Sequence, residues 1–351
     1  MRIVIATLGC RTNQAESAGM AELLRRRGHE VLPPSEAERC DAVIVNTCTV
    51  TATADKKSRN AVRRLRRQYP DALIAVCGCL PQTGEVIPDA DIVGGTANRA
   101  GFAEALEKRL PARVLTPLPS GFEDSLPDAR PLRRSRAYIR IQDGCDNRCA
   151  YCKVPQARGA ARSRAAESVV RAAKEAAENG AAEIVLTGIE IASYLPSLPE
   201  LTAAVCRAAA PVPVRLSSLD PRRADAELAQ ALTSEKNFRP AFHLSLQSCC
   251  DAVLAAMGRR YAAADIFAAF ACLREAWRGV TIAADIIVGF PGETDGDFLQ
   301  TLQTLQTLKP DGLHIFPYSR RPGTPAASMP GQHTRAVKAD RARRLREIFP
   351  K

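Results

Sequence analysis

Residues 137–152 read AYIRIQDGCDNRCAYC and decide the fold class of the second half of the chain. The segment AYIRIQ is a short run of mostly apolar residues, typical of a β-strand. Cys145, Cys149 and Cys152 follow in the next loop with Cys-x3-Cys-x2-Cys spacing. In parallel α/β folds, ligands bind at the carboxyl ends of the strands, so this loop is where we expect chemistry.

Three thiolates at this spacing can bind three irons of a [4Fe–4S] cube and leave the fourth iron open. An open iron can chelate the amino and carboxylate groups of S-adenosylmethionine (SAM), whose reductive cleavage yields a 5′-deoxyadenosyl radical. A zinc site is the alternative, but closed structural zinc usually takes four ligands. No fourth Cys or His stands nearby, since the histidines are scattered at positions 29, 243, 314 and 333. With Tyr151 before its third cysteine, the pattern resembles the radical SAM superfamily.

Strand and helix patterns alternate through the second half of the chain. We expect strands at residues 137–142, 183–187, 213–217, 241–246, 281–288 and 312–316. We expect helices at residues 165–179, 199–209, 225–233, 250–257, 263–276 and 294–307. Six such units indicate an open, partial (β/α)6 barrel, here a radical SAM barrel. A Pro/Gly loop and a basic helix at 333–348 follow.

The first 110 residues also alternate strands with helices. We expect strands at 2–8, 42–46, 73–78 and around 92–93, and helices at 14–27, 54–69 and 99–110. This order predicts a doubly wound parallel sheet covered on both faces. The fold class is therefore α/β throughout.

A second set of cysteines lies in this first half. Cys10, Cys48 and Cys79 each fall just after one expected strand, so they should converge at one edge of the sheet. Three soft ligands without an obvious fourth suggest a second cluster with a free iron. The alternative is three unrelated cysteines at strand ends.

Composition marks the domain boundaries. Residues 111–136 are rich in Pro, Gly, Ser and charge, as in a linker. We therefore divide the chain into an N-terminal domain (1–110), a linker (111–136), a radical SAM core (137–330) and a basic C-terminal helix (331–351).

Length, composition and net charge indicate the cellular location of the chain, the state of its cysteines and the kind of partner it binds. The 351 residues include 12 cysteines, 46% hydrophobic residues and a formal charge of +11. The sequence has neither a membrane-length apolar run nor a secretory signal, so we expect a cytoplasmic protein without a membrane partner. Disulfides are then disfavoured, and Cys206 and Cys272 occupy apolar helical positions typical of packing. The positive charge is compatible with a polyanion such as RNA, or with solvated helix faces.

The two cysteine sets together closely resemble the methylthiotransferase family over nearly the whole chain. The matching segments are LGCRTNQAES, NTCTVTATADKKSR, GCLPQ, IRIQDGCDNRCAYCKVPQARG, LTGIEIASY, RLSSLDP, HLSLQS, ADIIVGFPGET and FPYSRRPGTPAA. Within the family, the first segments look most like the branch that converts N6-threonylcarbamoyladenosine, next to the tRNA anticodon, to its 2-methylthio derivative. Sister branches modify an isopentenylated adenosine of tRNA or an aspartate of a ribosomal protein.

The resemblance implies a two-cluster enzyme. Cys10, Cys48 and Cys79 would hold an auxiliary [4Fe–4S] cluster that carries the transferred sulfur, and one SAM would methylate that sulfur. A second SAM, at the cluster of Cys145, Cys149 and Cys152, would supply the radical that removes hydrogen from adenine C2. An electron donor and a sulfur donor, both of unknown identity, are further implied partners. A non-catalytic iron–sulfur protein that binds RNA or transfers electrons is the alternative of another class.

Weaker candidates surround these cysteines. Residues at the ends of the expected barrel strands would contact SAM or the substrate, although packing or strand termination explains each nearly as well: Thr187, Gly188, Glu190, Ser217, Ser218, Gln247 and Asp285. Asn13 and Gln14 would cap a helix or face the auxiliary cluster. The basic helices would hold RNA through Arg63, Arg64, Arg66, Arg67, Arg343 and Arg344.

The sequence departs from the family pattern at four places. Family chains continue into a small RNA-binding barrel (TRAM), whereas this sequence ends at Lys351, so we expect that module to be absent and RNA docking to rely on the basic helices. Cys249 and Cys250 follow HLSLQS where Gly and a small residue are usual. Cys77, two residues before Cys79, should point the other way along its strand. Glu190 replaces a frequent Asn.

Overall fold

The computed structural model describes residues 1–128 and 135–349, which form two compact units. The first unit comprises Met1–Asp146, Lys153–Ala182 and Thr187–Ile189, and the second comprises Asn147–Cys152, Glu183–Leu186 and Glu190–Lys351. Within the described ranges, none of the helices has the length and apolar character needed to span a membrane.

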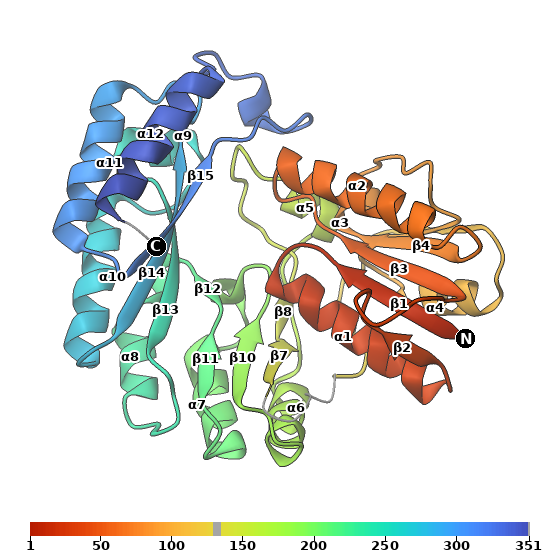
Figure 1. The fold of residues 1–351 in the computed structure, drawn as a ribbon. Coiled ribbons are helices and arrows are strands. Elements are labelled where there is room, and N and C mark those ends of the chain that lie inside the picture. Colours follow the sequence, from red (N-terminus) through yellow and green to blue (C-terminus); the bar gives the residue numbers. More distant parts are fainter. Residues whose placement is uncertain (129–134, 350–351) are drawn as a thin grey trace. The chain divides into compact units, whose positions relative to one another are not determined.

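The first unit contains a parallel sheet of six strands in the order β2-β1-β3-β4-β5-β6 (Figure 1). Its strands are β1 (Arg2–Thr7), β2 (Glu30–Leu32), β3 (Ala42–Thr47), β4 (Leu73–Gly78), β5 (Ile92–Gly94) and β6 (Ala112–Val114). Its helices are α1 (Arg11–Arg26), α2 (Ala52–Gln68), α3 (Cys79–Gln82) and α4 (Arg99–Glu107). The start of the segment expected as a linker thus supplies the edge strand β6.

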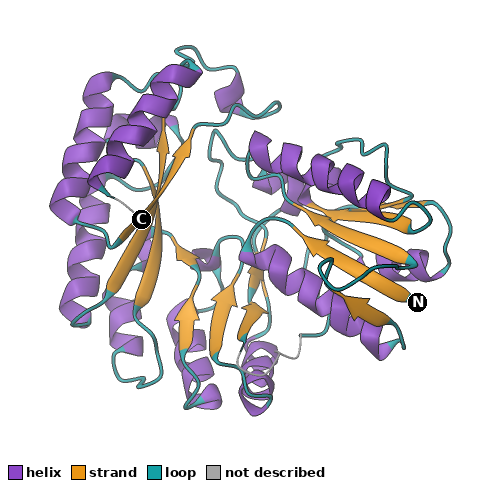
Figure 2. Cartoon of the chain, in the orientation of Figure 1, coloured by secondary structure: helices purple, strands orange, loops and turns teal. Residues whose placement is uncertain are grey.

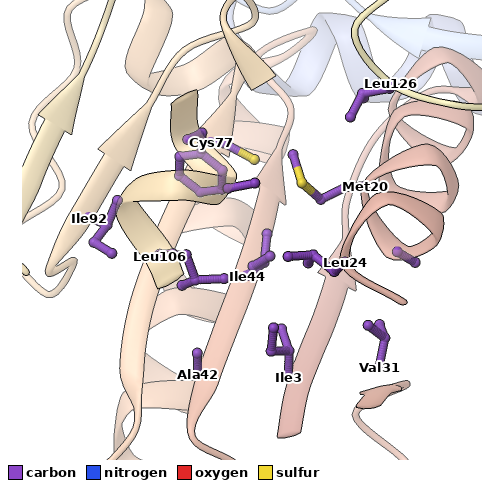
Figure 3. Packing of buried hydrophobic residues seen from close by; sticks show 14 residues of the cluster. Ile3, Met20, Leu24, Val31, Ala42, Ile44, Cys77, Ile92, Leu106 and Leu126 are labelled. Carbon is purple, nitrogen blue, oxygen red and sulfur yellow. The ribbon is translucent and has the colours of Figure 1, made fainter. Parts of the chain in front are cut away.

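Each face of this sheet has its own apolar core, as the doubly wound prediction requires. Helices α1 and α4 cover one face through a cluster that includes Ile3, Leu24, Ile44 and Phe102 (Figure 3). Helix α2 covers the other face, and its side chains Val62 and Leu65 pack on strand residues of β1, β3 and β4. The helices on the two faces of these strands are visible in Figure 2. Alternation along β4 sends neighbouring side chains to opposite cores.

The rest of the first unit begins the radical SAM segment. It contains β7 (Arg136–Arg140), β8 (Gln142–Asp143), α5 (Val154–Arg158), β9 (Arg162–Ser163) and α6 (Ala166–Glu178). Strands β8 and β9 pair antiparallel, with Gln142 opposite Ser163. Helix α5 follows the cysteine loop and packs on α3 of the same unit.

The second unit continues the strand–helix alternation. Its strands are β10 (Glu183–Thr187, whose last residue belongs to the first unit), β11 (Val214–Leu216), β12 (Ser218–Leu219), β13 (Ala241–Gln247), β14 (Thr281–Val288) and β15 (Gly312–Pro317). Its α-helices are α7 (Leu198–Ala209), α8 (Ala226–Leu232), α9 (Asp251–Ala256), α10 (Ala263–Ala276), α11 (Asp295–Leu308) and α12 (Arg335–Ile348). Strands β12, β13, β14 and β15 form one parallel sheet, and β10 pairs in parallel with β11.

The expected architecture of an α/β barrel segment is confirmed. The strand expected at 213–217 is split, because Ser217 separates β11 from β12. Along β13 and β14, every second side chain is buried, and the others are half-buried apart from the exposed Thr281. One face of this sheet is therefore packed away and the other remains open to polar side chains.

Candidate functional site

Cys10, Cys48 and Cys79 lie at the carboxyl ends of three adjacent strands of the first unit. Cys10 follows β1 and precedes α1, Cys48 follows β3, and Cys79 begins α3 directly after β4. Strands β1, β3 and β4 are neighbours in the parallel sheet, so their carboxyl ends share one edge. A Cβ added at Gly9, the residue before Cys10, would lie 2.9 Å from Cys48 Sγ, so the loops of these two cysteines lie against each other.

Two of these cysteines directly follow a glycine whose backbone conformation and close surroundings exclude any other residue. Gly9 and Gly78 have φ values of +107° and +102°. A Cβ on Gly9 would lie 2.6 Å from the Cβ of Cys48, and one on Gly78 would lie 2.5 Å from the Asn46 side chain. Each Gly-Cys pair therefore lets the backbone pass tightly against the neighbouring loop while presenting a thiol.

Asn13 ties the loops of the first two cysteines together. Its Nδ2 donates to the carbonyl oxygens of Leu8 and Thr47, at 2.9 and 2.8 Å. Its Oδ1 lies 3.5 Å from Cys10 Sγ. Of the two expectations for Asn13, helix cap or site residue, the structure places this buried amide beside the thiols; Gln14 is exposed.

Helix α2 holds the loop of Cys48. Thr51 caps the helix, with its side chain accepting from the Ala54 N–H. One turn further, Ser58 Oγ accepts from the Cys48 N–H and donates to the Cys48 carbonyl, at 3.3 and 3.2 Å. The Thr51 cap fixes where α2 begins, and the first turns of the helix then place Ser58 beside the Cys48 backbone.

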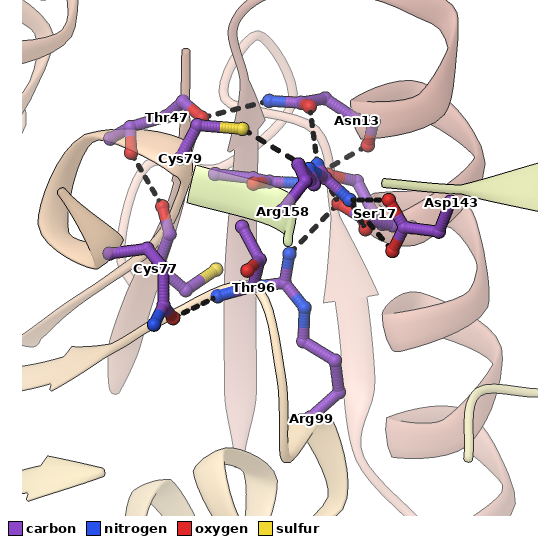
Figure 4. Close-up of polar contacts among 12 residues, drawn as sticks. Asn13, Ser17, Thr47, Cys77, Cys79, Thr96, Arg99, Asp143 and Arg158 are labelled. Atoms are coloured by element: carbon purple, nitrogen blue, oxygen red, sulfur yellow. Dashed lines mark hydrogen bonds and ion pairs between the residues drawn. The ribbon is translucent and has the colours of Figure 1, made fainter. Parts of the chain in front are cut away.

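Arg158, at the end of α5, reaches Cys79 of this set (Figure 4). Its side chain is fully buried, its Nε donates to Cys79 Sγ at 3.3 Å, and its Nη2 donates to Asn13 Oδ1 at 3.1 Å. Asn13 Oδ1 therefore has Cys10 Sγ on one side and Arg158 on the other. A residue of the radical SAM segment thus connects two of the three candidate ligands.

A buried ionic network surrounds Arg158. Glu16 contacts Arg158, Arg99 and Arg140, with the Arg99 bond at 2.8 Å and the Arg140 bond at 3.3 Å. Asp143 lies 3.3 Å from Arg158 Nη1 and 3.4 Å from Arg162. Burial alone would raise the pKa of Glu16, but the charges of Arg158 and Arg99 and the Arg158 hydrogen bond lower it to about 2. The carboxylate is therefore ionised at neutral pH.

The network suits a site for thiolate ligands. Burial raises the pKa of Cys48 to about 11 and that of Cys79 to about 12, although Arg158 opposes the shift at both thiols. The thiols stay neutral until a metal displaces their protons. Four guanidinium groups against two carboxylates leave positive charge beside them, which would balance the thiolates of a bound cluster (Arg99, Arg140, Arg158 and Arg162 against Glu16 and Asp143). The donor set therefore fits an iron–sulfur cluster.

The Cys-x3-Cys-x2-Cys loop is divided between the units. In the first unit, the Cys145 N–H donates to the Gly159 carbonyl at 3.0 Å. In the second, the Cys152 N–H donates to the Cys149 carbonyl at 3.0 Å, which makes a tight turn between these two thiols. Ala150 between them is buried, and its N–H donates to the Met257 carbonyl at 2.9 Å. The turn is thereby fixed on the core of the second unit.

Arg259 holds Cys149 much as Arg158 holds Cys79. Its Nη1 donates to Cys149 Sγ at 3.3 Å, and its Nη2 donates to Asp220 at 3.3 Å. The guanidinium also lies over the ring of Tyr261, 4.7 Å from its centre. A cation is thus placed at the second candidate thiolate site as well.

The candidate SAM residues lie in different settings. Thr187 and Ser217 are buried and Ser218 is exposed, while Gln247 ends β13 with φ +64°. Gly188 follows β10. Glu190 accepts from Asn147 at 3.3 Å, and burial and Asp220 raise its pKa to about 7. Asp285 lies between two histidines on the β13–β15 strands.

The candidate RNA-binding arginines lie on α2 and α12, and several have partners within the chain. Arg63, Arg64 and Arg67 are exposed, whereas Arg66 is tied to Asp91 and two carbonyls. On α12, Arg343 pairs with Asp340 and Glu347, and Arg344 stacks over Phe298. Of the candidate RNA-binding arginines, Arg63, Arg64 and Arg67 on α2 therefore have the most accessible charge.

The cysteines not expected to bind metal are buried or half-buried. Cys77 belongs to the core under α1 and α4, on the face of β4 away from α2, as expected from strand alternation. Cys206, Cys249 and Cys250 are buried, and Cys272 is half-buried. Cys250 Sγ lies 3.2 Å from an Asp297 oxygen.

Sequence reasoning missed Arg158 and Arg259, the arginines that contact candidate ligand thiols. Arg158 lies within the matching segment KVPQARG, but 79 positions from its thiol partner, and Arg259 lies 110 positions from Cys149. Glu16 was likewise hidden in LGCRTNQAES. For Arg158 and Glu16, a position inside a matching segment was the only available signal, whereas Arg259 lies outside those segments.

Comparisons with known proteins match both halves of the chain. The radical SAM superfamily matches residues 139–305, and the family described as Uncharacterized protein family UPF0004 matches residues 2–91. Among solved structures, the radical SAM methyltransferase TsrM from Kitasatospora setae superposes with a TM-score of 0.69 at 20% identity, over 93% of this chain and 76% of that one. At this identity, the likeness shows the fold.

Similar sequences cover almost the whole chain. The threonylcarbamoyladenosine tRNA methylthiotransferase MtaB of Bacillus subtilis is 35% identical over 98% of this chain and 79% of its own length. The tRNA-2-methylthio-N(6)-dimethylallyladenosine synthase of Desulfosudis oleivorans is 35% identical over 99% of this chain and 78% of its own. Together with the two sets of strand-end cysteines, these similarities show that the chain belongs to the methylthiotransferase family of radical SAM enzymes.

Proposed function

We propose that this chain is a tRNA methylthiotransferase that converts N6-threonylcarbamoyladenosine, beside the anticodon, to its 2-methylthio derivative. The observation that carries the proposal is that Cys10, Cys48 and Cys79 follow three adjacent strands at one sheet edge, with Cys10 and Cys79 joined through the Asn13–Arg158 contact. Generation of the radical needs only one site with three thiols. A second such site therefore implies a second reaction, which in this family is sulfur transfer. Relatives with the threonylcarbamoyl specificity in their names reach 35% identity.

Two [4Fe–4S] clusters and SAM are the cofactors of this proposal. Cys145, Cys149 and Cys152 would hold the cluster that binds SAM, and Cys10, Cys48 and Cys79 would hold the auxiliary cluster. When bound, these groups supply the radical, the methyl group and the sulfur. An electron donor and a sulfur donor complete the reaction.

The chain's own residues would position and insulate these groups. Arg158 and Arg259 place a guanidinium N–H on one thiol of each set, which orients that ligand and compensates its charge. Glu190, Ser217 and Ser218 would then contact SAM or substrate from the strand ends.

A tRNA substrate agrees with the charge of the chain. The formal charge is +11, and the exposed face of α2 carries Arg63, Arg64 and Arg67. Phosphate contacts by such residues would position RNA without reading its sequence.

A dimethylallyl- or isopentenyladenosine substrate is the second candidate, favoured by one observation. The Desulfosudis oleivorans synthase matches at the same 35% identity as the Bacillus subtilis enzyme. Both candidates share the C2 chemistry and differ in the N6 substituent of the adenosine. A ribosomal-protein aspartate is the third, and the basic charge of the chain disfavours it.

Mass spectrometry of tRNA nucleosides from cells with and without this gene tests the substrate. Deletion should abolish 2-methylthio-N6-threonylcarbamoyladenosine and leave its unmethylthiolated precursor to accumulate. Complementation with the intact gene should restore the product, and complementation with a Cys48→Ala variant should not. If deletion instead abolishes 2-methylthio-N6-isopentenyladenosine, the second candidate replaces the first. If neither 2-methylthio nucleoside changes, both candidates are refuted.

A further inference from the structure

Two histidines and an aspartate that are far apart in the sequence meet on the β13–β15 strands of the second unit. His243 Nε2 lies 2.7 Å from Asp285 Oδ1, and His314 Nδ1 lies 3.3 Å from the same oxygen. The two imidazole rings are 4.8 Å apart between centroids. We propose that His243, Asp285 and His314 form a binding site for one divalent transition-metal cation of the Zn²⁺ type, separate from the cysteine sites.

The backbone register places the three side chains on one face of the sheet. His243 of β13 lies opposite Ala283 of β14, and Asp285, two residues further along β14, lies opposite His314 of β15. Opposed residues of parallel strands share a face, and neighbouring strands are about 4.8 Å apart. This is the less buried face, because the intervening residues of β13 and β14 are the buried ones: Phe242, Leu244, Leu246, Ile282, Ala284 and Ile286.

Small neighbours leave room for the cluster. Ala283 and Gly312 lie opposite each other on β14 and β15, one step before Asp285 and His314 along this face. Ser218 of β12 lies opposite His243 on the other side. The face therefore has short side chains on the side of the donors that precedes them along these strands.

The spacing of the donor atoms suits a small cation. The three candidate ligand atoms all lie within 4.8 Å of one another. A tetrahedral cation bound at about 2.0–2.1 Å holds its ligand atoms about 3.3 Å apart. The His314–Asp285 separation already has this value, and the His243–Asp285 separation is 0.6 Å shorter than it. A small rotation of side chains would therefore complete the geometry.

The hydrogen bonding of His243 supports a ligand better than a simple ion pair. His243 Nε2 is buried and makes no aligned hydrogen bond with any described residue, although it is 2.7 Å from Asp285 Oδ1. A buried polar nitrogen without an aligned partner is costly. A cation would use the lone pair of each imidazole and the carboxylate charge together.

The donor set defines the kind of cation. Two imidazoles and one carboxylate suit Zn²⁺ and similar first-row ions, whereas Mg²⁺ and Ca²⁺ prefer oxygen ligands only. Three protein ligands leave at least one position open, as in catalytic rather than structural zinc sites. His314 has 55% of its side chain exposed, against 13% for His243, so the site opens to solvent on the His314 side.

Zinc binding by the cluster-loaded holoenzyme tests the proposal. With the cysteines occupied by iron–sulfur clusters, equilibrium dialysis against Zn²⁺ should give one zinc per chain, while the iron content stays constant. Asp285→Asn and His314→Ala should each weaken this binding by more than the ~10–100-fold that loss of an outer partner causes. His314→Ala is the safer of the two variants, because this side chain is mostly exposed and its removal should leave the fold intact.

His333→Ala is the matched control, since His333 is a histidine of the same unit outside the cluster. This variant should bind zinc as the wild type does. The proposal is overturned if the holoenzyme binds no zinc, if His314→Ala binds as much as the wild type, or if zinc appears only where iron is lost. None of these results bears on the tRNA nucleosides, so the proposed function is tested independently.

Discussion

The two cysteine sites share one contact but differ in what surrounds it. An arginine donates to a cysteine sulfur at 3.3 Å in both, Arg158 to Cys79 in the first unit and Arg259 to Cys149 in the second. Arg158 is completely buried and contacts two carboxylates, Glu16 and Asp143. Arg259 contacts one carboxylate, and the face of its guanidinium lies on an aromatic ring. The same hydrogen bond is therefore held by networks of different size.

The difference predicts unequal sensitivity to mutation. Removal of Arg158 would take one cation from each of two buried carboxylates, leaving Glu16 with Arg99 and Arg140, and Asp143 with Arg140 and Arg162. Removal of Arg259 would leave Asp220 still paired with Arg222 at 3.0 Å. Taking a cation from two buried carboxylates costs more than taking one from a single buried carboxylate. The first site should thus depend on its arginine for folding and metal binding, and the second mainly for metal binding.

Arg158→Met should give the largest effect. The variant removes the charge but keeps much of the volume, so we expect the apoprotein to lose about 3–5 kcal/mol of unfolding free energy, measured by urea denaturation. After anaerobic reconstitution, iron should fall from about eight per chain to about four, because the auxiliary thiols lose a supporting donor. Eight irons in the variant would contradict a role for Arg158 at this site.

Arg99→Gln is the control for that variant. Arg99 binds Glu16 at 2.8 Å and hydrogen-bonds Cys77, which lies in the core under α1 and α4 rather than with the candidate ligands. We expect lower stability with the iron content unchanged. If Arg99→Gln also loses about four irons, the loss reflects damage to the fold rather than the contact with Cys79.

The second largest effect should come from acidification, which should lower the unfolding free energy through protonation of Glu16. The pKa of Glu16 falls from its ordinary 4.5 to about 2 in the folded chain, owing to the arginines that overcome burial. A lowered pKa contributes stability that is full above pH 4.5 and is lost as the pH falls towards 2, and the shift corresponds to about 3 kcal/mol. Urea denaturation from pH 6 to pH 3 should show about 2 kcal/mol of this loss in the wild type, because pH 3 still lies above the folded pKa. Parallel curves for wild type and Glu16→Gln would contradict it.

Much of the first site could be predicted from the sequence because its key features are local. Cys10, Cys48 and Cys79 each end an apolar strand, and parallel strands must place their carboxyl ends at one edge. The position of Cys77 also followed from the alternation of side chains along β4. The arginines could not be predicted, because their pairing with distant thiols and carboxylates depends on how α5 packs within the first unit.

The histidine cluster shows where strand prediction stops being sufficient. His243, Asp285 and His314 all lie in strands expected from the sequence, yet the histidines looked scattered. Their meeting requires both the order of neighbouring strands and the offset of two residues between His243 and Asp285. Strand patterns alone define neither the register nor the offset between neighbouring strands. Asp285, which we expect to contact SAM or the substrate, has both imidazoles against one carboxylate oxygen.

Arg259→Met should have the smallest effect on stability. Asp220 keeps Arg222, and Tyr261 keeps its hydrogen bonds to the carbonyls of Ser245 and Leu246, so we expect a loss of about 1–2 kcal/mol. Iron should nevertheless fall from about eight to about four, this time from the Cys145–Cys152 loop, because the donor to Cys149 is gone. Arg222→Gln, which weakens the same carboxylate pair without touching a cysteine, should keep all its iron. A stability loss as large as that of Arg158→Met would remove the distinction between the two sites, and full iron retention would show that Arg259 does not support its cluster.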